Sequence, residues 1–115
     1  MSLTAEQILA ADDMGLKKVT VPEWGGDVFI RVMSVGERDE YERMWIGQKD
    51  KGIDNFRTKY LARCLCHPEN GERLFDEQGI EQLAKKSSAV VSKLFEKAMK
   101  HNNMTESDVE ELAKN

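Results

Sequence analysis

The sequence has few of the residues that usually carry chemistry. Its two histidines are His67 and His101, and its two cysteines are Cys64 and Cys66. Catalysis by histidine needs a nucleophile or a carboxylate placed beside the ring, and no motif supplies one. Phosphate-binding glycine loops are also missing, because Gly25-Gly26 falls in a predicted hairpin turn and not between a strand and a helix. We therefore expect that the protein is not an enzyme and binds no cofactor.

A metal site would have to use the C-x-C-H cluster of Cys64, Cys66 and His67. Structural zinc takes four ligands with turns between ligand pairs. The only other histidine, His101, lies near the end of a predicted helix, where its ring would complement the helix dipole. We favour the alternative that Cys64 belongs to the core and Cys66 to a helix end, and we expect no metal.

Long apolar runs are absent as well. No stretch of 18 apolar residues could cross a membrane as a helix, and the N-terminus lacks the pattern of a signal peptide. The cysteines stand one residue apart, a spacing that would strain a disulfide. These absences together predict a protein of the reducing cytoplasm without a membrane partner.

Charge and length set further limits. With 17 basic and 21 acidic residues the net charge is −4, so the basic excess typical of nucleic-acid-binding proteins is missing. A chain of 115 residues suffices for one domain with a core of its own. We expect a short N-terminal helix or arm over residues 1–16 and a single domain over residues 17–115.

The N-terminal third of the chain predicts a helix followed by a β-hairpin. Thr4-Ala5-Glu6-Gln7 has the spacing of a capping box, which begins a short helix. Over residues 17–33 the apolar period changes to two, which indicates two strands, and Trp24-Gly25-Gly26-Asp27 supplies the reversal. Pro22 has no backbone donor and belongs on an edge or at the start of the bend.

The rest of the chain predicts helices. Ser34-Val35-Gly36-Glu37 forms a second capping box, and Asp76 stands where an N-cap is expected. Asn70-Gly71 suits a type I′ turn and predicts a tight corner or small hairpin. The fold class is α+β: a mostly helical small domain with one N-terminal antiparallel hairpin and about five helices, near residues 35–47, 53–66, 77–86, 88–101 and 106–113.

Two features are candidates for binding a protein partner. Val91, Phe95 and Met99 lie at spacings of four along the apolar stripe of the predicted helix 88–101, so they could line a groove or helix of a partner if part of the stripe faces outward. The alternative is that all three are core. Trp24, at the hairpin tip, is either an exposed interface anchor or folds back onto the sheet.

Self-association is a further expectation. Pro22 protects only one side of the hairpin, so its other side is open to pairing with another strand. The chain also contains six methionines, whose side chains adapt to different surfaces. We expect oligomers, ring-like or open-ended, at raised concentration.

Residues 80–98 could also be read as a helix-turn-helix with a local excess of lysine. The turn has Ser87-Ser88 where such motifs usually place glycine, and the second helix is mostly apolar, which leaves few side chains to read bases. Lysines alone contact phosphates. A small DNA-binding regulator and a generic protein-interaction module stay as alternatives.

Four segments follow one another in a characteristic order: IRVMSVGERDEY over residues 30–41, CHPENGERLFD over 66–76, IEQLAKKS over 80–87 and NNMT over 102–105. In order and character they resemble the tail assembly chaperones of long-tailed, siphovirus-type phages and prophages. The resemblance covers most of the chain from about Val19 onward.

This resemblance implies a role that needs no catalytic site. Chaperones of this family bind the tape measure protein, keep it soluble and help tail tube subunits polymerise around it. They act in the cytoplasm of the bacterial host and are absent from the mature virion. The family often makes a longer product by translational frameshifting, through which we expect contact with the tail tube protein. From the resemblance we expect a virion assembly chaperone without a nucleic-acid partner.

Overall fold

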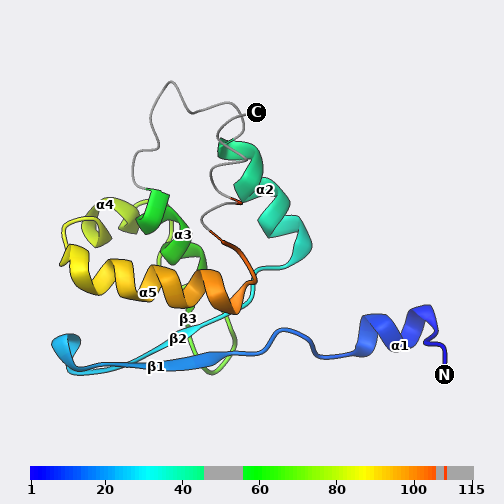
Figure 1. Ribbon diagram of the computed structural model, residues 1–115. Helices are drawn as coiled ribbons and strands as arrows, with labels where there is room; N and C mark the ends of the chain where they lie inside the picture. The colour runs from blue at the N-terminus through cyan, green and yellow to red at the C-terminus, as the bar shows by residue number, and fades with distance from the viewer. Residues whose placement is uncertain (46–55, 106–107, 109–115) are drawn as a thin grey trace.

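The computed structural model describes residues 1–45, 56–105 and 108 (Figure 1). Within them, three strands form one antiparallel sheet of order β1-β2-β3, and five helices accompany it. The α+β fold class is confirmed. The elements in chain order are α1 (Ala5–Ala10), β1 (Lys17–Val21), the 3₁₀ turn η1 (Pro22–Trp24), β2 (Gly26–Ile30), α2 (Val35–Trp45), α3 (Phe56–Cys64), β3 (Leu65–Cys66), α4 (Gly79–Leu83) and α5 (Ser88–His101).

The hairpin predicted near the N-terminus is formed by β1 and β2. Its register pairs Lys17 with Ile30 at the open end and Val21 with Gly26 at the tip. The chain reverses through η1, and Gly25 then takes a φ of +74°. Only glycine adopts this left-handed conformation without a steric penalty, so Gly25 fixes where the hairpin turns.

A third strand pairs with β2, and the sequence did not predict this pairing. The helix expected over residues 53–66 ends at Cys64, and Leu65–Cys66 pairs with Phe29 and Ile30 of β2. The prediction of helix at these two residues is therefore wrong. Their apolar side chains continue the helical stripe, but the free edge of β2 offers backbone partners that complete a sheet. Residues 53–55 lie outside the described part.

The small hairpin predicted at Asn70-Gly71 is present, with a bridge between Cys66 and Arg73, but its turn is of a different type from the one predicted. A type I′ turn needs positive φ at both central residues, and only Gly71 has it, at +73°. The side chain of Asn70 instead accepts a hydrogen bond from the Glu72 amide at 2.9 Å, as in an Asx turn. The His67 amide donates to the Glu72 carbonyl at 2.8 Å and closes the corner.

The helix observed after Asp76 differs in length from the predicted one. α4 is shorter than the predicted range 77–86, and Asp76 precedes it by more than a cap position. The Asp76 carboxylate accepts from the amides of Gln78 and Gly79, so it orders the turn that leads into α4. The predicted helix 106–113 lies outside the described residues except for Asp108.

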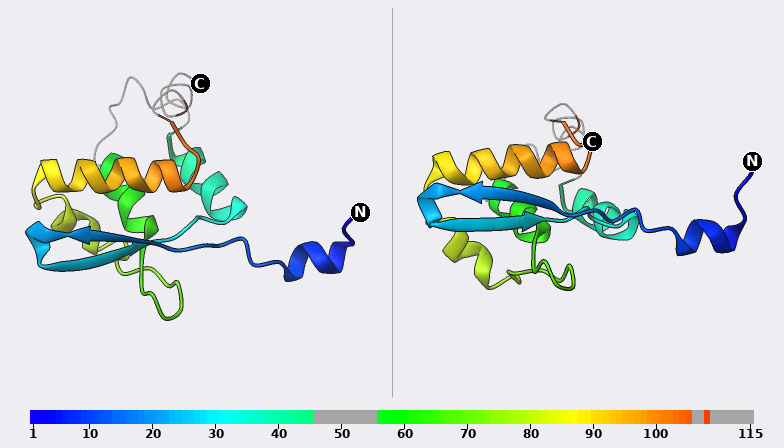
Figure 2. Two further views of the ribbon diagram at one scale, coloured as in Figure 1. Left: turned by 60° about the horizontal axis from the view of Figure 1, so that its bottom comes forward. Right: turned by 90° about the horizontal axis from the view of Figure 1, so that it is seen from below.

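The core is formed where α3 packs against α5 and α4, with the sheet beside them (Figures 1 and 2). Aromatic rings from α2, α3 and α5 meet edge to face: the Tyr41 and Tyr60 centroids are 5.3 Å apart, and those of Tyr60 and Phe95 are 5.5 Å apart. The largest fully buried side chains are Tyr41, Tyr60, Ile30, Leu61, Leu65, Leu94, Cys64 and Cys66.

Candidate partner-binding surface

The apolar stripe of α5 faces inward over its whole width. Val91, Phe95 and Met99 are 6%, 5% and 5% exposed. The Phe95 ring packs edge to face on Phe56 at 5.7 Å between centroids, in addition to its contact with Tyr60. In the single chain these residues occupy the core, as in the alternative that the sequence left open. Their contact with a partner stays a prediction.

Trp24 is neither fully exposed nor fully buried, so its position lies between the two alternatives that the sequence left open. Its ring is half-buried and packs against the edge of the core, and the Lys86 ammonium lies 5.8 Å from the ring centroid. This distance is typical of a cation–π interaction. Trp24 also lines an open cleft of about 390 Å³ at the hairpin tip, here called the Trp24 cleft. Its lining residues are Glu23, Trp24, Phe75, Gln82, Leu83 and Lys86.

The N-terminal arm, residues 1–16, is the other open apolar feature. The predicted capping box is present, since Thr4 Oγ1 accepts from the Gln7 amide and Gln7 Oε1 accepts from the Thr4 amide. No residue of α1 is buried. Leu3, Ile8 and Leu9 are exposed by 62%, 57% and 86%, although no pattern in the sequence pointed to them as binding residues.

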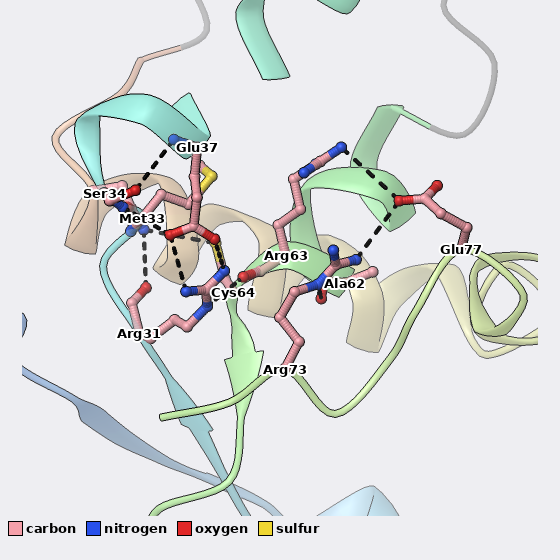
Figure 3. A network of polar contacts seen from close by, with 10 residues as sticks. Arg31, Met33, Ser34, Glu37, Ala62, Arg63, Cys64, Arg73 and Glu77 are labelled. Carbon is pink, nitrogen blue, oxygen red and sulfur yellow. Dashed lines mark hydrogen bonds and ion pairs between the residues drawn. The ribbon is translucent and has the colours of Figure 1, made fainter. Parts of the chain in front are cut away.

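A network of ionic contacts joins β2, α2 and α3 (Figure 3). Arg31 forms a two-pronged ion pair with Glu37, and its Nε donates to the Arg63 carbonyl at 2.7 Å. Burial raises the pKa of Glu37, but hydrogen bonds from Arg31 and Ser34 outweigh it and lower that pKa to about 2. The predicted Ser34–Glu37 capping box is present. Glu37 Oε1 accepts a hydrogen bond from the Ser34 amide, and the Ser34 hydroxyl oxygen accepts one from the Glu37 amide. The network therefore fixes the start of α2.

A second set of ionic contacts lies beside this network. Arg63 and Arg73 both approach Glu77 Oε1 at 3.9 Å (Figure 3). These separations are too long for hydrogen bonds. Glu77 is largely exposed, so the contacts stabilise the fold only weakly.

The C-x-C-H cluster does not come together as a site. Cys64 and Cys66 are buried, whereas His67 is exposed. Cys64 is a core residue, and its burial raises the pKa of the thiol to about 12, so the thiol stays protonated. His101 Nε2 lies 2.8 Å from the Gly15 carbonyl, at the root of the arm. Among residues 1–45, 56–105 and 108, no three histidine, cysteine, aspartate or glutamate side chains are grouped to hold a metal ion.

None of the described helices has the length and apolar character needed to span a membrane. The described surface includes an exposed apolar arm and a shallow cleft, which suit contact with other macromolecules.

A family model described as phage tail assembly chaperone matches residues 5–115. The chain belongs to this family. The resemblance found in the sequence is therefore confirmed. The fold of this chaperone is also similar to that in the structure of the bacteriophage HK97 tail assembly chaperone, with a TM-score of 0.57 and 23% sequence identity. The similarity covers 87% of this chain and 94% of that chain. No curated protein matches the sequence.

Proposed function

We propose that this chaperone binds the tape measure protein, keeps it soluble and promotes the polymerisation of tail tube subunits around it. The observation that carries the proposal is the family match over residues 5–115, which includes every described element of the domain. The protein acts in the cytoplasm of the host, is not part of the mature virion, and binds neither nucleic acid nor membranes. Contact with the tail tube protein is made through a longer frameshift product.

The surface supports binding of an apolar, helical partner. A chaperone for such a partner needs accessible apolar groups that can cover it and later release it. In the Trp24 cleft, Trp24, Phe75 and Leu83 supply such groups next to the polar side chains of Gln82 and Lys86. Trp24 is therefore the first contact that we propose for the tape measure protein.

Val91, Phe95 and Met99 are proposed as secondary contacts. Because these three side chains are buried, a partner reaches them only if the segments that pack on α5 move away from it. Residues 103–105 line a hollow together with Met99, so displacement of this short segment would expose the C-terminal end of the stripe first.

Co-expression with the tape measure protein tests the proposal. The soluble fraction of the tape measure protein is measured alone, with the wild-type chaperone, and with Trp24→Ala. We expect the wild type to raise the soluble fraction and Trp24→Ala to lower it again, because the cleft loses its largest apolar wall. Val35→Ala is the matched control, since Val35 is 80% exposed and lies on α2. A tape measure protein that is equally insoluble with and without the wild type would contradict the proposed function.

A further inference from the structure

The helix in the N-terminal arm has strong local signals but nothing to pack on. Its capping box is complete, with amide-to-side-chain distances of 2.9 and 3.2 Å between Thr4 and Gln7. Isolated helices shorter than about 12 residues are marginal in water. A six-residue helix with no buried residue therefore needs an external surface to be stable.

The arm has the character of an acidic amphipathic segment. Leu3 and Ile8 occupy the two positions of a hydrophobic staple around the N-cap, and Leu9 extends the apolar surface. Residues 2–16 contain three acidic residues and no lysine or arginine. A surface that fits this arm must offer apolar walls with basic groups beside them.

The Trp24 cleft offers such a surface. Its apolar walls are Trp24, Phe75 and Leu83, and Lys86 stands at its rim with exposed Lys85 next to it. Glu23 is the one acidic residue among its lining residues. The stretch over residues 85–100 contains five lysines and one glutamate, although the whole chain has a net charge of −4. The arm is thus acidic, whereas residues 85–100, which begin beside the cleft, are basic.

The arm and the cleft lie at opposite ends of the molecule. The arm leaves the open end of the hairpin and points away from the domain (Figures 1 and 2). The cleft is lined by Glu23 and Trp24 of η1, at the hairpin tip. The Gly15 carbonyl is held by His101 at 2.8 Å, at the C-terminal end of α5. The arm would have to reverse its direction beyond this anchor to reach the cleft of its own chain. A second copy meets it without such a reversal.

We propose that the arm of one chain docks on the Trp24 cleft of a second copy. Leu3, Ile8 and Leu9 then face the apolar walls, and the acidic residues of the arm lie towards Lys85 and Lys86. This inference rests on the self-association expected for the proposed function and names the two surfaces that make it. The contact is head to tail, so an open assembly has a free cleft at one end and a free arm at the other, and only that free cleft stays open to the tape measure protein.

Sedimentation of the full chain over a range of concentrations tests this contact. The arm variant is Ile8→Glu with Leu9→Glu, and the cleft variant is Lys85→Glu with Lys86→Glu. All four side chains are exposed, so the variants keep the fold. We expect the wild type to gain mass with concentration. The arm variant loses central apolar contacts and should associate at least about tenfold more weakly. The cleft variant places negative charge opposite the acidic arm and should also associate more weakly. Asp39→Lys with Arg43→Glu, on the exposed face of α2, is the control and should associate like the wild type.

Mixing the two variants gives a sharper result. The cleft variant keeps an intact arm and the arm variant keeps an intact cleft, so the mixture should form heterodimers and nothing larger. A charge exchange provides a second readout. The double variant Asp12→Lys with Asp13→Lys should weaken association by itself. Combining these two substitutions with those of the cleft variant in one chain should restore association.

Other outcomes overturn the proposal in distinguishable ways. Wild-type association that is unchanged in both variants assigns self-association to another surface. A wild type that stays monomeric into the hundred-micromolar range contradicts self-association itself, while the co-expression assay still tests tape measure binding. If the wild type is monomeric, the tryptophan fluorescence of the wild type and of the arm variant is compared, with Trp45→Phe in both, so that Trp24 gives the signal. A difference between them shows that the arm folds back onto the cleft of its own chain. Normal association of Trp24→Ala together with loss of tape measure solubility assigns the cleft to the tape measure protein.

Discussion

The amide of Met33 donates a 2.7 Å hydrogen bond to Oδ1 of Asn102, although the two residues are 69 positions apart. The Asn102 side chain is buried and its Nδ2 donates to the carbonyls of Ala98 at 2.9 Å and Arg31 at 3.3 Å. Arg38 in turn donates to the Asn102 carbonyl at 3.0 Å. A single side chain therefore joins the end of α5 to the segment that connects β2 with α2.

Replacing this side chain should destabilise the domain. Asn102→Ala leaves the buried Met33 amide without its acceptor, and an unsatisfied buried group costs about 1 to 3 kcal/mol. We expect the free energy of unfolding to fall by that amount in denaturant titrations. Lys100→Ala, an exposed change in the last turn of α5, should stay within about 0.5 kcal/mol of the wild type. Equal stability of the two variants would show that the hydrogen bond does not hold α5 in place.

The ion pair of Glu37 predicts a loss of stability in acid. The pKa of Glu37 is lowered from 4.5 to about 2 in the folded state, so the unfolded chain binds the proton more readily. The contribution is complete above about pH 4.5 and is lost as the pH falls towards about 2. Glu37→Gln should show a shallower decline of unfolding free energy over this range. The control Glu40→Gln, exposed on α2, should follow the wild type. Parallel curves for the wild type and Glu37→Gln would contradict the assignment.

The burial of the α5 stripe predicts large effects of core substitutions. Phe95→Ala should lower the free energy of unfolding by about 3 to 5 kcal/mol, because removal of the ring leaves a cavity beside Phe56 and Tyr60. Val91→Asp and Met99→Asp place a charge in the core and should unfold a marginally stable domain. Thermal melting measures these effects.

Lys93→Asp, on the exposed side of the same helix, is the matched control for the aspartate variants. It should melt close to the wild type. If Val91→Asp or Met99→Asp stays folded and fails to keep the tape measure protein soluble, that residue contacts the partner directly.

Duplex DNA should bind only weakly and without sequence preference. The exposed basic residues of α5 include Lys93 and Lys100, which can contact phosphates, while its apolar side chains are in the core. We expect a titration to show weak attraction that disappears with added salt. Sub-micromolar binding to one sequence would favour the DNA-binding regulator over the chaperone.

Local structure follows from the sequence because its causes lie within a few residues. The capping boxes at Thr4–Gln7 and Ser34–Glu37 form as predicted, since each needs only side chains and amides three positions apart. α5 runs from Ser88 to His101, the predicted range, because Ser87 caps it and its apolar stripe is continuous. The order of motifs also identified the family.

The tertiary structure alone decided where each surface points. Leu65–Cys66 became a strand because β2 had a free edge beside it, which no pattern within the segment indicates. The apolar residues of α5 and of the arm show the same helical spacing in the sequence, yet Phe95 is buried by Tyr60 and Phe56 whereas Ile8 is exposed. Burial depends on which elements pack together, and those contacts join residues far apart in the chain. The Trp24 cleft likewise exists only because the hairpin tip folds against α4 and the turn that follows it.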